Sequence, residues 1–125
     1  MMAKIFLFSG SAAAFLGVAL GAFGAHALKS KLAAEMLAIY QTGVHYHLVH
    51  ALGLILVGIL AERTGNSALV SWAGWLLLAG IIIFSGSLYA LSISGVRALG
   101  AITPIGGLSF LAGWALLAVA ALRQF

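Results

Sequence analysis

The placement of charge constrains this chain more than any other feature of its sequence. Eight Lys, Arg, Asp and Glu residues occur in 125 positions, and they leave charge-free intervals at 5–28, 36–61, 64–96 and 98–122. These intervals contain 24, 26, 33 and 25 residues. A helix needs about 20 apolar residues to cross a hydrocarbon core of roughly 30 Å. The spacing therefore predicts four transmembrane helices.

The composition excludes most other classes of protein. Hydrophobic residues make up 64% of the chain and charged residues 6%, which is too little charge for the surface of a soluble domain or for a disordered chain. The net charge of +4 comes from scattered cations that form no basic stripe for nucleic acid, so we expect them to face lipid headgroups. The chain has no cysteine and hence no disulfide or thiolate metal ligand. We expect the lipid bilayer as partner and no nucleic acid.

We predict an all-α membrane protein, a four-transmembrane-helix bundle formed by a single domain over residues 1–125. The expected helices span about 5–27, 37–61, 69–91 and 103–122, with an amphipathic connector at 28–36 and a polar hairpin at 62–66. Thr103 followed by Pro104 is typical of a helix N-cap and the first helical position.

The first segment has one alternative interpretation, a cleaved signal peptide. Lys4 precedes an apolar run, and Ala25-His26-Ala27 has the small-x-small pattern of a cleavage site. The apolar run, however, exceeds the usual length of about 7–15 residues for such a signal. We therefore expect this segment to be a retained transmembrane helix.

The glycines predict how the helices pack. At about 100° per residue, the small residues of the first helix fall on one narrow face; they are Gly10, Ala13, Gly17, Gly21 and Gly24. A looser stripe on the fourth helix contains Gly106, Ser109 and Gly113. Small side chains let helix backbones approach closely in lipid, where no hydrophobic force drives helices together. We expect both stripes to be helix contacts, with a ligand channel along the glycines as the alternative.

The histidines have the greatest chemical capacity in this chain. His45, His47 and His50 lie in the first half of the second helix and His26 ends the first, so all four lie toward one side of the membrane. His47 and His50 are about 60° apart on a helical wheel, on a face shared with Tyr40, whereas His45 points elsewhere. His26 joins them only if the first helix bends near its last glycine. We predict a polar pocket of His26, Tyr40, His47 and His50 that opens toward the first connector and holds water or a lipid headgroup.

Ionisable groups at membrane depth are functional candidates, because an unpaired polar group in hydrocarbon costs several kcal/mol. The histidines fit three roles: hydrogen-bonded neutral side chains, ligands of a metal or haem, and a proton relay. The evidence for a metal site is weak, because His47 and His50 are three residues apart and lack the glutamate that follows the first histidine of an H-E-x-x-H motif. Ser85-Gly86-Ser87 lacks the strand-to-helix turn of a nucleophile elbow, so we expect its hydroxyls to bond to helix carbonyls or across to another helix. We predict no catalytic residues, no enzyme activity and no cofactor.

Motifs in all four predicted helices resemble those of a known family. They are GAFGAH at 21–26 followed by Leu28, YHLVHAL at 46–52, FSGSLY at 84–89, TPIGG at 103–107 and GW at 113–114. The chain resembles the domain-of-unknown-function 423 family, the YgdD/YwdK-type proteins of bacterial inner membranes, to which the eukaryotic transmembrane-256 proteins are related. The resemblance implies four helices and a multi-pass location in the bacterial inner (cytoplasmic) membrane, but no catalytic residues. It suggests His26 and His50 as the family's histidines, with Gln frequent at position 47.

Three functions fit these features. We expect a structural or accessory component of a membrane assembly, associated with a second copy of itself or with another membrane protein. A small transporter or channel for protons, metal or a small solute is the first alternative, although the first helix has no carboxylate to exchange protons for cationic drugs. A haem-, metal- or quinone-binding redox component is the second.

The four-helix map predicts that both termini lie on one side of the membrane. Cysteines in place of Ser67 and Ser94 should then react with an impermeant maleimide from opposite sides, whereas labelling of both from the same side would contradict the map. Each side carries three cations, Lys4, Arg63 and Arg123 against Lys29, Lys31 and Arg97. The positive-inside rule therefore favours neither orientation, and only the positive charge of the N-terminal amine favours termini on the cytoplasmic side.

Overall fold

The chain folds into helices along nearly its whole length. The structure is a computed structural model that describes residues 1–125. Its long elements are α1 (Met2–His26), α2 (Ala34–Arg63), α3 (Ala68–Gly80), α4 (Gly86–Ser94) and α5 (Thr103–Gln124). Two 3-10 turns, η1 (Leu28–Ser30) and η3 (Arg97–Ala101), lie in the connections. A π-helical segment, η2 (Ile81–Ser85), joins α3 to α4 without a break.

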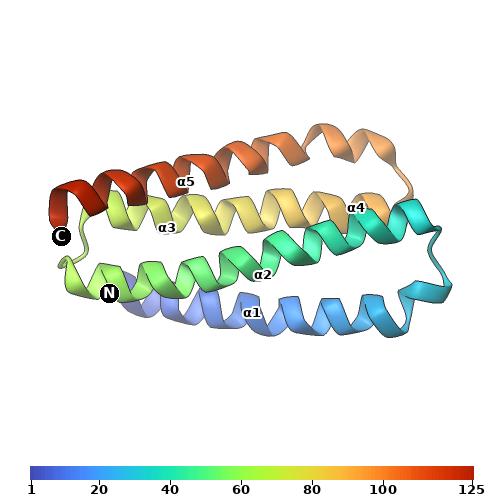
Figure 1. Ribbon diagram of the computed structural model, residues 1–125, viewed down its shortest axis with the longest axis horizontal. Helices are drawn as coiled ribbons and strands as arrows, with labels where there is room; N and C mark the ends of the chain where they lie inside the picture. Colours follow the sequence, from blue (N-terminus) through green and yellow to red (C-terminus); the bar gives the residue numbers. More distant parts are fainter.

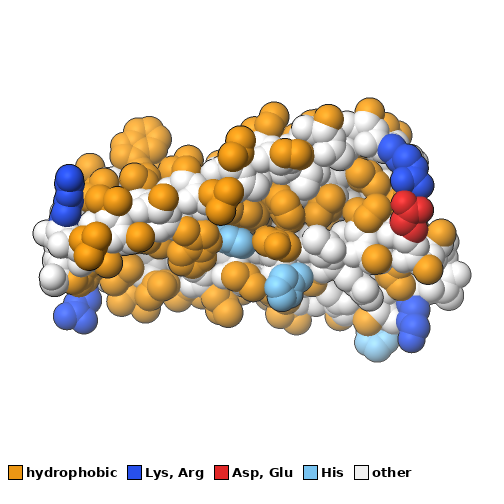
Figure 2. Space-filling model, turned by 45° about the horizontal axis from the view of Figure 1, so that its top comes forward, with side chains coloured by type: hydrophobic (Ala, Val, Ile, Leu, Met, Phe, Trp, Pro, Cys, Tyr) orange, Lys and Arg blue, Asp and Glu red, His pale blue; other side chains and the backbone are white.

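Four helical segments are long and apolar enough to cross a membrane. They are Met2–His26, Ala34–Arg63, Ala68–Ser94 and Arg97–Gln124. Lys and Arg side chains lie at both ends of the molecule, an acidic side chain is seen at one of them, and hydrophobic side chains cover the band between the ends (Figure 2). This distribution suits a bilayer, with the charged ends among the headgroups and the apolar band among the acyl chains. The predicted fold class is confirmed.

The helix boundaries differ from the predicted ones in three respects. α1 and α2 each begin three residues earlier than expected, at Met2 and Ala34, because the charged residues of a first turn can extend toward the headgroups without breaking the helix. The third span contains η2, which hydrophobic periodicity did not indicate. Thr103 is not an N-cap: it lies within α5, and its hydroxyl oxygen is 2.5 Å from that of Ser87.

Successive spans are antiparallel neighbours (Figure 1). α1 packs along α2, α2 packs against α3, η2 and α4, and α5 packs against α3 and η2. Gly65 and Asn66, both with φ of 62°, turn α2 into α3. Both chain termini lie at the same end of the bundle (Figure 1), as the four-helix map requires. The other end is closed by an exposed ion pair between Arg97 and Glu35, with an N–O distance of 3.0 Å.

The glycines of α1 lie where the helix meets α2. A Cβ atom built on Gly10 would lie 2.8 Å from the backbone nitrogen of Ile55 and 2.9 Å from the carbonyl oxygen of Ala51. Gly17 faces the side chain of Leu48, and Gly24 faces the ring of Tyr40. The backbones of α1 and α2 therefore touch at Gly10, whereas at Gly17 and Gly24 side chains of α2 fill the space that a Cβ atom would need.

The stripe on α5 makes a similar approach to the third span. A Cβ atom on Gly106 would overlap the backbone of Phe84 in η2. A Cβ atom on Gly113 would lie 2.8 Å from the side chain of Leu77 and 3.2 Å from the carbonyl oxygen of Ala73 in α3. Gly106 and Gly113 therefore set the distance between α5 and the helix it packs against.

Adding a single methyl group at a backbone contact should destabilise the bundle. We expect Gly10→Ala to lower the free energy of unfolding by about 1–3 kcal/mol, because the backbone of Ile55 cannot move without shifting α2. Gly86→Ala is the matched control, since nothing lies within 4 Å of a Cβ at that helical position. Denaturant unfolding in detergent, followed by helicity, measures both variants. Equal stability of Gly10→Ala and Gly86→Ala would contradict the packing described here.

Candidate functional site

His47 lies between three helices. Its ring is 5% exposed, with Nε2 2.7 Å from the carbonyl oxygen of Ala13 in α1 and Nδ1 2.8 Å from the hydroxyl of Tyr89 in α4. Because a carbonyl only accepts, Nε2 carries the proton and donates to Ala13. In the neutral ring, Nδ1 then accepts from the Tyr89 hydroxyl. His47 thereby joins α2 to both α1 and α4.

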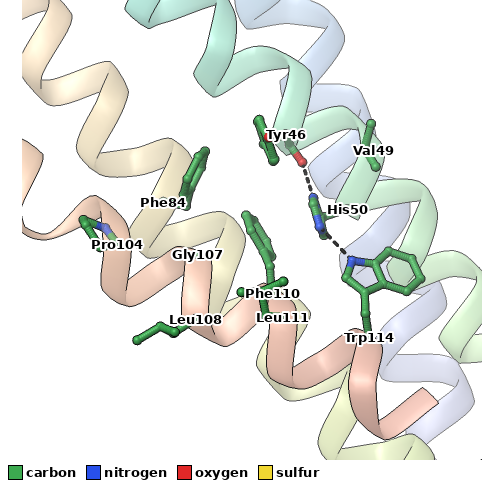
Figure 3. A pocket seen from close by; sticks show the side chains of 10 residues that line it. All are labelled: Tyr46, Val49, His50, Phe84, Pro104, Gly107, Leu108, Phe110, Leu111 and Trp114. Atoms are coloured by element: carbon green, nitrogen blue, oxygen red, sulfur yellow. Dashed lines mark hydrogen bonds between the residues drawn. The ribbon is translucent and has the colours of Figure 1, made fainter. Parts of the chain in front are cut away.

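His50 lies one turn further along α2 and is held in the opposite tautomer. Its Nδ1 donates to the carbonyl oxygen of Tyr46 at 2.7 Å, and its Nε2 accepts from the indole N–H of Trp114 at 3.0 Å (Figure 3). Indole is only a donor, so the ring that receives this bond is neutral. The imidazole also stacks on Phe110, with ring centroids 3.6 Å apart and planes inclined by 15°. His50 therefore connects α2 to α5.

The two buried histidines do not form one site. His47 bonds toward α1 and α4, and His50 bonds toward α5. Each ring uses both of its nitrogens within the protein. No three His, Asp or Glu side chains of the chain gather where they could hold a metal ion together. Chemically, the two imidazoles act as links between helices.

Tyr40 belongs with His47 and is separate from His50. Its hydroxyl donates to the carbonyl oxygen of Leu20 in α1, and its ring lies 5.3 Å from that of Tyr89. Ser85 makes a related bond from η2, where its buried hydroxyl donates to the carbonyl oxygen of Gly43 at 2.7 Å. Ser109 of α5 likewise donates to the carbonyl oxygen of Leu76 in α3 at 2.6 Å. Bonding across to another helix is one of the two arrangements expected of Ser85.

The structure does not bring His26 to the other predicted pocket residues. α1 remains helical through Gly24 to His26, and the His26 side chain is exposed at the end of the helix. Without a bend near Gly24, the ring points away from the face that packs on α2. His45 also lies apart from the buried pair, exposed on the outer surface of α2.

The cavity beside His50 is apolar, and His50 is the one predicted pocket residue in its wall. It has a volume of about 680 Å³ and lies between α2, η2 and α5 (Figure 3). Its wall is formed by Tyr46, Val49, His50, Phe84, Pro104, Gly107, Leu108, Phe110, Leu111 and Trp114. Val49, Leu108 and Leu111 are exposed at its rim, so the cavity faces the acyl chains and does not open toward the first connector. A second cavity of about 390 Å³ lies between α1 and the third span, with His47 and Tyr89 in its wall.

Sequence reasoning missed the partners of both histidines. Tyr89 and Trp114 are absent from the predicted pocket, although both supply a hydrogen bond to a buried ring. A signal for Trp114 was available, because an indole inside a transmembrane helix needs an acceptor for its N–H group.

Comparison with known proteins identifies a family for the chain. Residues 20–107 match the family described as "Protein of unknown function (DUF423)". The UPF0382 membrane protein YwdK of Bacillus subtilis is 48% identical over 96% of this chain and 98% of its own length. The UPF0382 membrane protein SH2409 of Staphylococcus haemolyticus is 45% identical over 96% of this chain and 97% of its own. No solved structure matches the chain. With a matching family model and relatives that align over nearly their full length, the chain belongs to the DUF423 (UPF0382) family of membrane proteins.

Proposed function

We propose that this protein is a structural or accessory component of an assembly in the bacterial inner (cytoplasmic) membrane and has no enzymatic activity of its own. The relatives in Bacillus and Staphylococcus are membrane proteins of bacteria, which supports this location. A second copy of the chain or another membrane protein is the proposed partner, besides the lipid bilayer itself.

One observation supports this proposal: both nitrogens of each buried imidazole are hydrogen-bonded within the bundle. His47 uses both ring nitrogens to join α2 to α1 and α4, and His50 uses both within α2 and toward α5. A proton relay or a ligand site needs a ring nitrogen that is free to exchange partners. The transport alternative receives less support, because these two groups bond in different directions and do not form a continuous polar path.

Substitution of His47 separates a linking role from a chemical one. We expect His47→Leu to lower the free energy of unfolding by roughly 1–3 kcal/mol, because it removes two interhelical bonds and leaves the Tyr89 hydroxyl unpaired. His47→Gln keeps a donor and an acceptor and should lose less than about 1 kcal/mol. His26→Leu, at an exposed position at the end of α1 without a hydrogen bond, is the control. Unfolding in detergent measures all three, and equal losses for Leu and Gln at position 47 would contradict the linking role.

The cavity beside His50 favours a second candidate function, binding of a lipid-soluble ring compound of the quinone class. The rings of Phe84, Phe110 and Trp114 form much of its wall, and a planar molecule can stack on such rings. The Tyr46 hydroxyl makes no hydrogen bond within the chain and is available to donate to a carbonyl oxygen. The volume of about 680 Å³ lies within the usual range for small-molecule sites.

Purification from native membranes in mild detergent distinguishes the two candidates. We expect a membrane protein to co-purify in fixed stoichiometry, while organic extracts of the pure chain contain no quinone. Recovery of a quinone instead, with loss in Leu111→Trp, which fills the cavity, and retention in Leu122→Trp, which lies away from it, would favour the second candidate. A chain purified as a monomer, without a membrane protein or a quinone, would count against both.

A further inference from the structure

The outer face of α2 carries polar side chains at a depth where the other spans present apolar ones. Its exposed residues follow one another at steps of three and four: Thr42, His45, Val49, Leu52, Leu56 and Ile59. We call these six residues the α2 outer stripe. Gln41 is exposed beside its first residue. Figure 2 shows histidine side chains at the surface of the hydrophobic band, between the two charged ends of the molecule.

His45 is exposed on α2 between the two charged ends of the molecule and makes no hydrogen bond within the protein. Ten residues separate it from Glu35, whose ion pair with Arg97 marks the headgroup end of the bundle, so it lies about 15 Å along the helix from that level. The headgroup layer accounts for about 5 Å of this distance, so His45 lies about 10 Å inside the hydrocarbon core. No hydrogen bond joins the His45 ring or the Gln41 amide to the rest of the chain, whereas Thr42 bonds to its own helix.

An imidazole facing acyl chains at this depth is unfavourable, because neither water nor a headgroup is within its reach. A partner that supplies a donor and an acceptor at the same depth removes this penalty. A second copy of the chain supplies both, since a neutral imidazole has one donor and one acceptor and an amide has two donors and an acceptor. The stripe is therefore complementary to itself.

We propose that two copies of this chain associate through the α2 outer stripe, with their α2 helices parallel and His45 and Gln41 bonded across the interface. In a parallel pair, Gln41 and His45 face the same polar residues of the partner. In an antiparallel pair centred on His45, Gln41 would face Val49 and remain unpaired. The alternating steps of three and four continue through Leu52, Leu56 and Ile59, the spacing of two helices that cross at about 20°. This inference deepens the proposed assembly role and rests on it.

Disulfide cross-linking of the full chain in phosphatidylethanolamine and phosphatidylglycerol vesicles tests the geometry. The chain has no cysteine of its own, so Thr42→Cys and Val49→Cys each introduce a single thiol. We expect each variant to cross-link with itself. Val18→Cys, which is 64% exposed on α1, is the control and should stay uncross-linked. Cross-links between a Thr42→Cys chain and a Val49→Cys chain would overturn the parallel arrangement.

Removal of the polar groups tests the cause of association. We expect the double variant Gln41→Leu/His45→Leu to raise the dissociation constant of the dimer about tenfold, as measured by single-molecule photobleaching over a series of protein-to-lipid ratios. Ser11→Leu removes an exposed hydroxyl from α1 and should leave the constant unchanged. A wild-type chain that is monomeric at every ratio would overturn the inference, as would a dimer insensitive to the double variant.

Co-purification separates this inference from the proposed function. A monomeric chain that still recovers another membrane protein in fixed stoichiometry would refute the α2 dimer and leave the assembly role standing. If that recovery also depends on Gln41 and His45, the stripe binds the other protein, and the inference of a second copy is wrong. A dimer without any further partner would support the inference and confine the assembly to copies of this chain.

Discussion

The bilayer offers no water to a polar group, and the rest of this structure depends on that constraint. Backbone groups satisfy it by forming helices across the whole hydrocarbon region. Polar side chains satisfy it by bonding to neighbouring helices: Tyr40 to the carbonyl of Leu20, His47 to that of Ala13. Residues that look like candidates for chemistry in the sequence thus serve in the structure as links between spans.

These links require helices that lie close together, which the glycines permit. Gly10, Gly17 and Gly24 bring the backbone of α1 against α2, and side chains of α2 can then reach carbonyls of α1. The π-helical segment η2 lies at the corresponding contact on the other side, where Ser85 reaches Gly43 and the backbone of Phe84 meets Gly106. π-Helical turns frequently occur at functional positions, and this one borders both cavities of the bundle.

The interior and the outer surface of α2 differ in how far they satisfy this constraint. Inside the bundle, both buried imidazoles are fully bonded and in defined tautomers. Outside it, the exposed side chains of Gln41 and His45 make no hydrogen bond within the chain. A lateral surface with unpaired polar groups favours association in the plane of the membrane, which connects the proposed assembly role with the proposed α2 interface.

Much of the fold was predictable from the order of the residues. Charge spacing determines how many segments can cross the bilayer, and the helical period determines which glycines share a face; both are properties of one helix at a time. For the same reason, Tyr40 and the two buried histidines could be placed on the inner side of α2. The positions of Gly65 and Pro104 near helix ends also follow from local backbone preferences.

Only the tertiary structure decided which groups meet. Tyr89 is 42 residues from His47, and Trp114 is 64 residues from His50, so no local pattern relates them. The straight course of α1, which leaves His26 outside, and the π-helical turn at Ile81–Ser85 likewise depend on contacts between helices. The amino-acid sequence alone determined the spans and their faces, because these follow from the period of a single helix. The pairing of polar side chains depends on how each helix is rotated and shifted against its neighbours, which is settled when all four pack together.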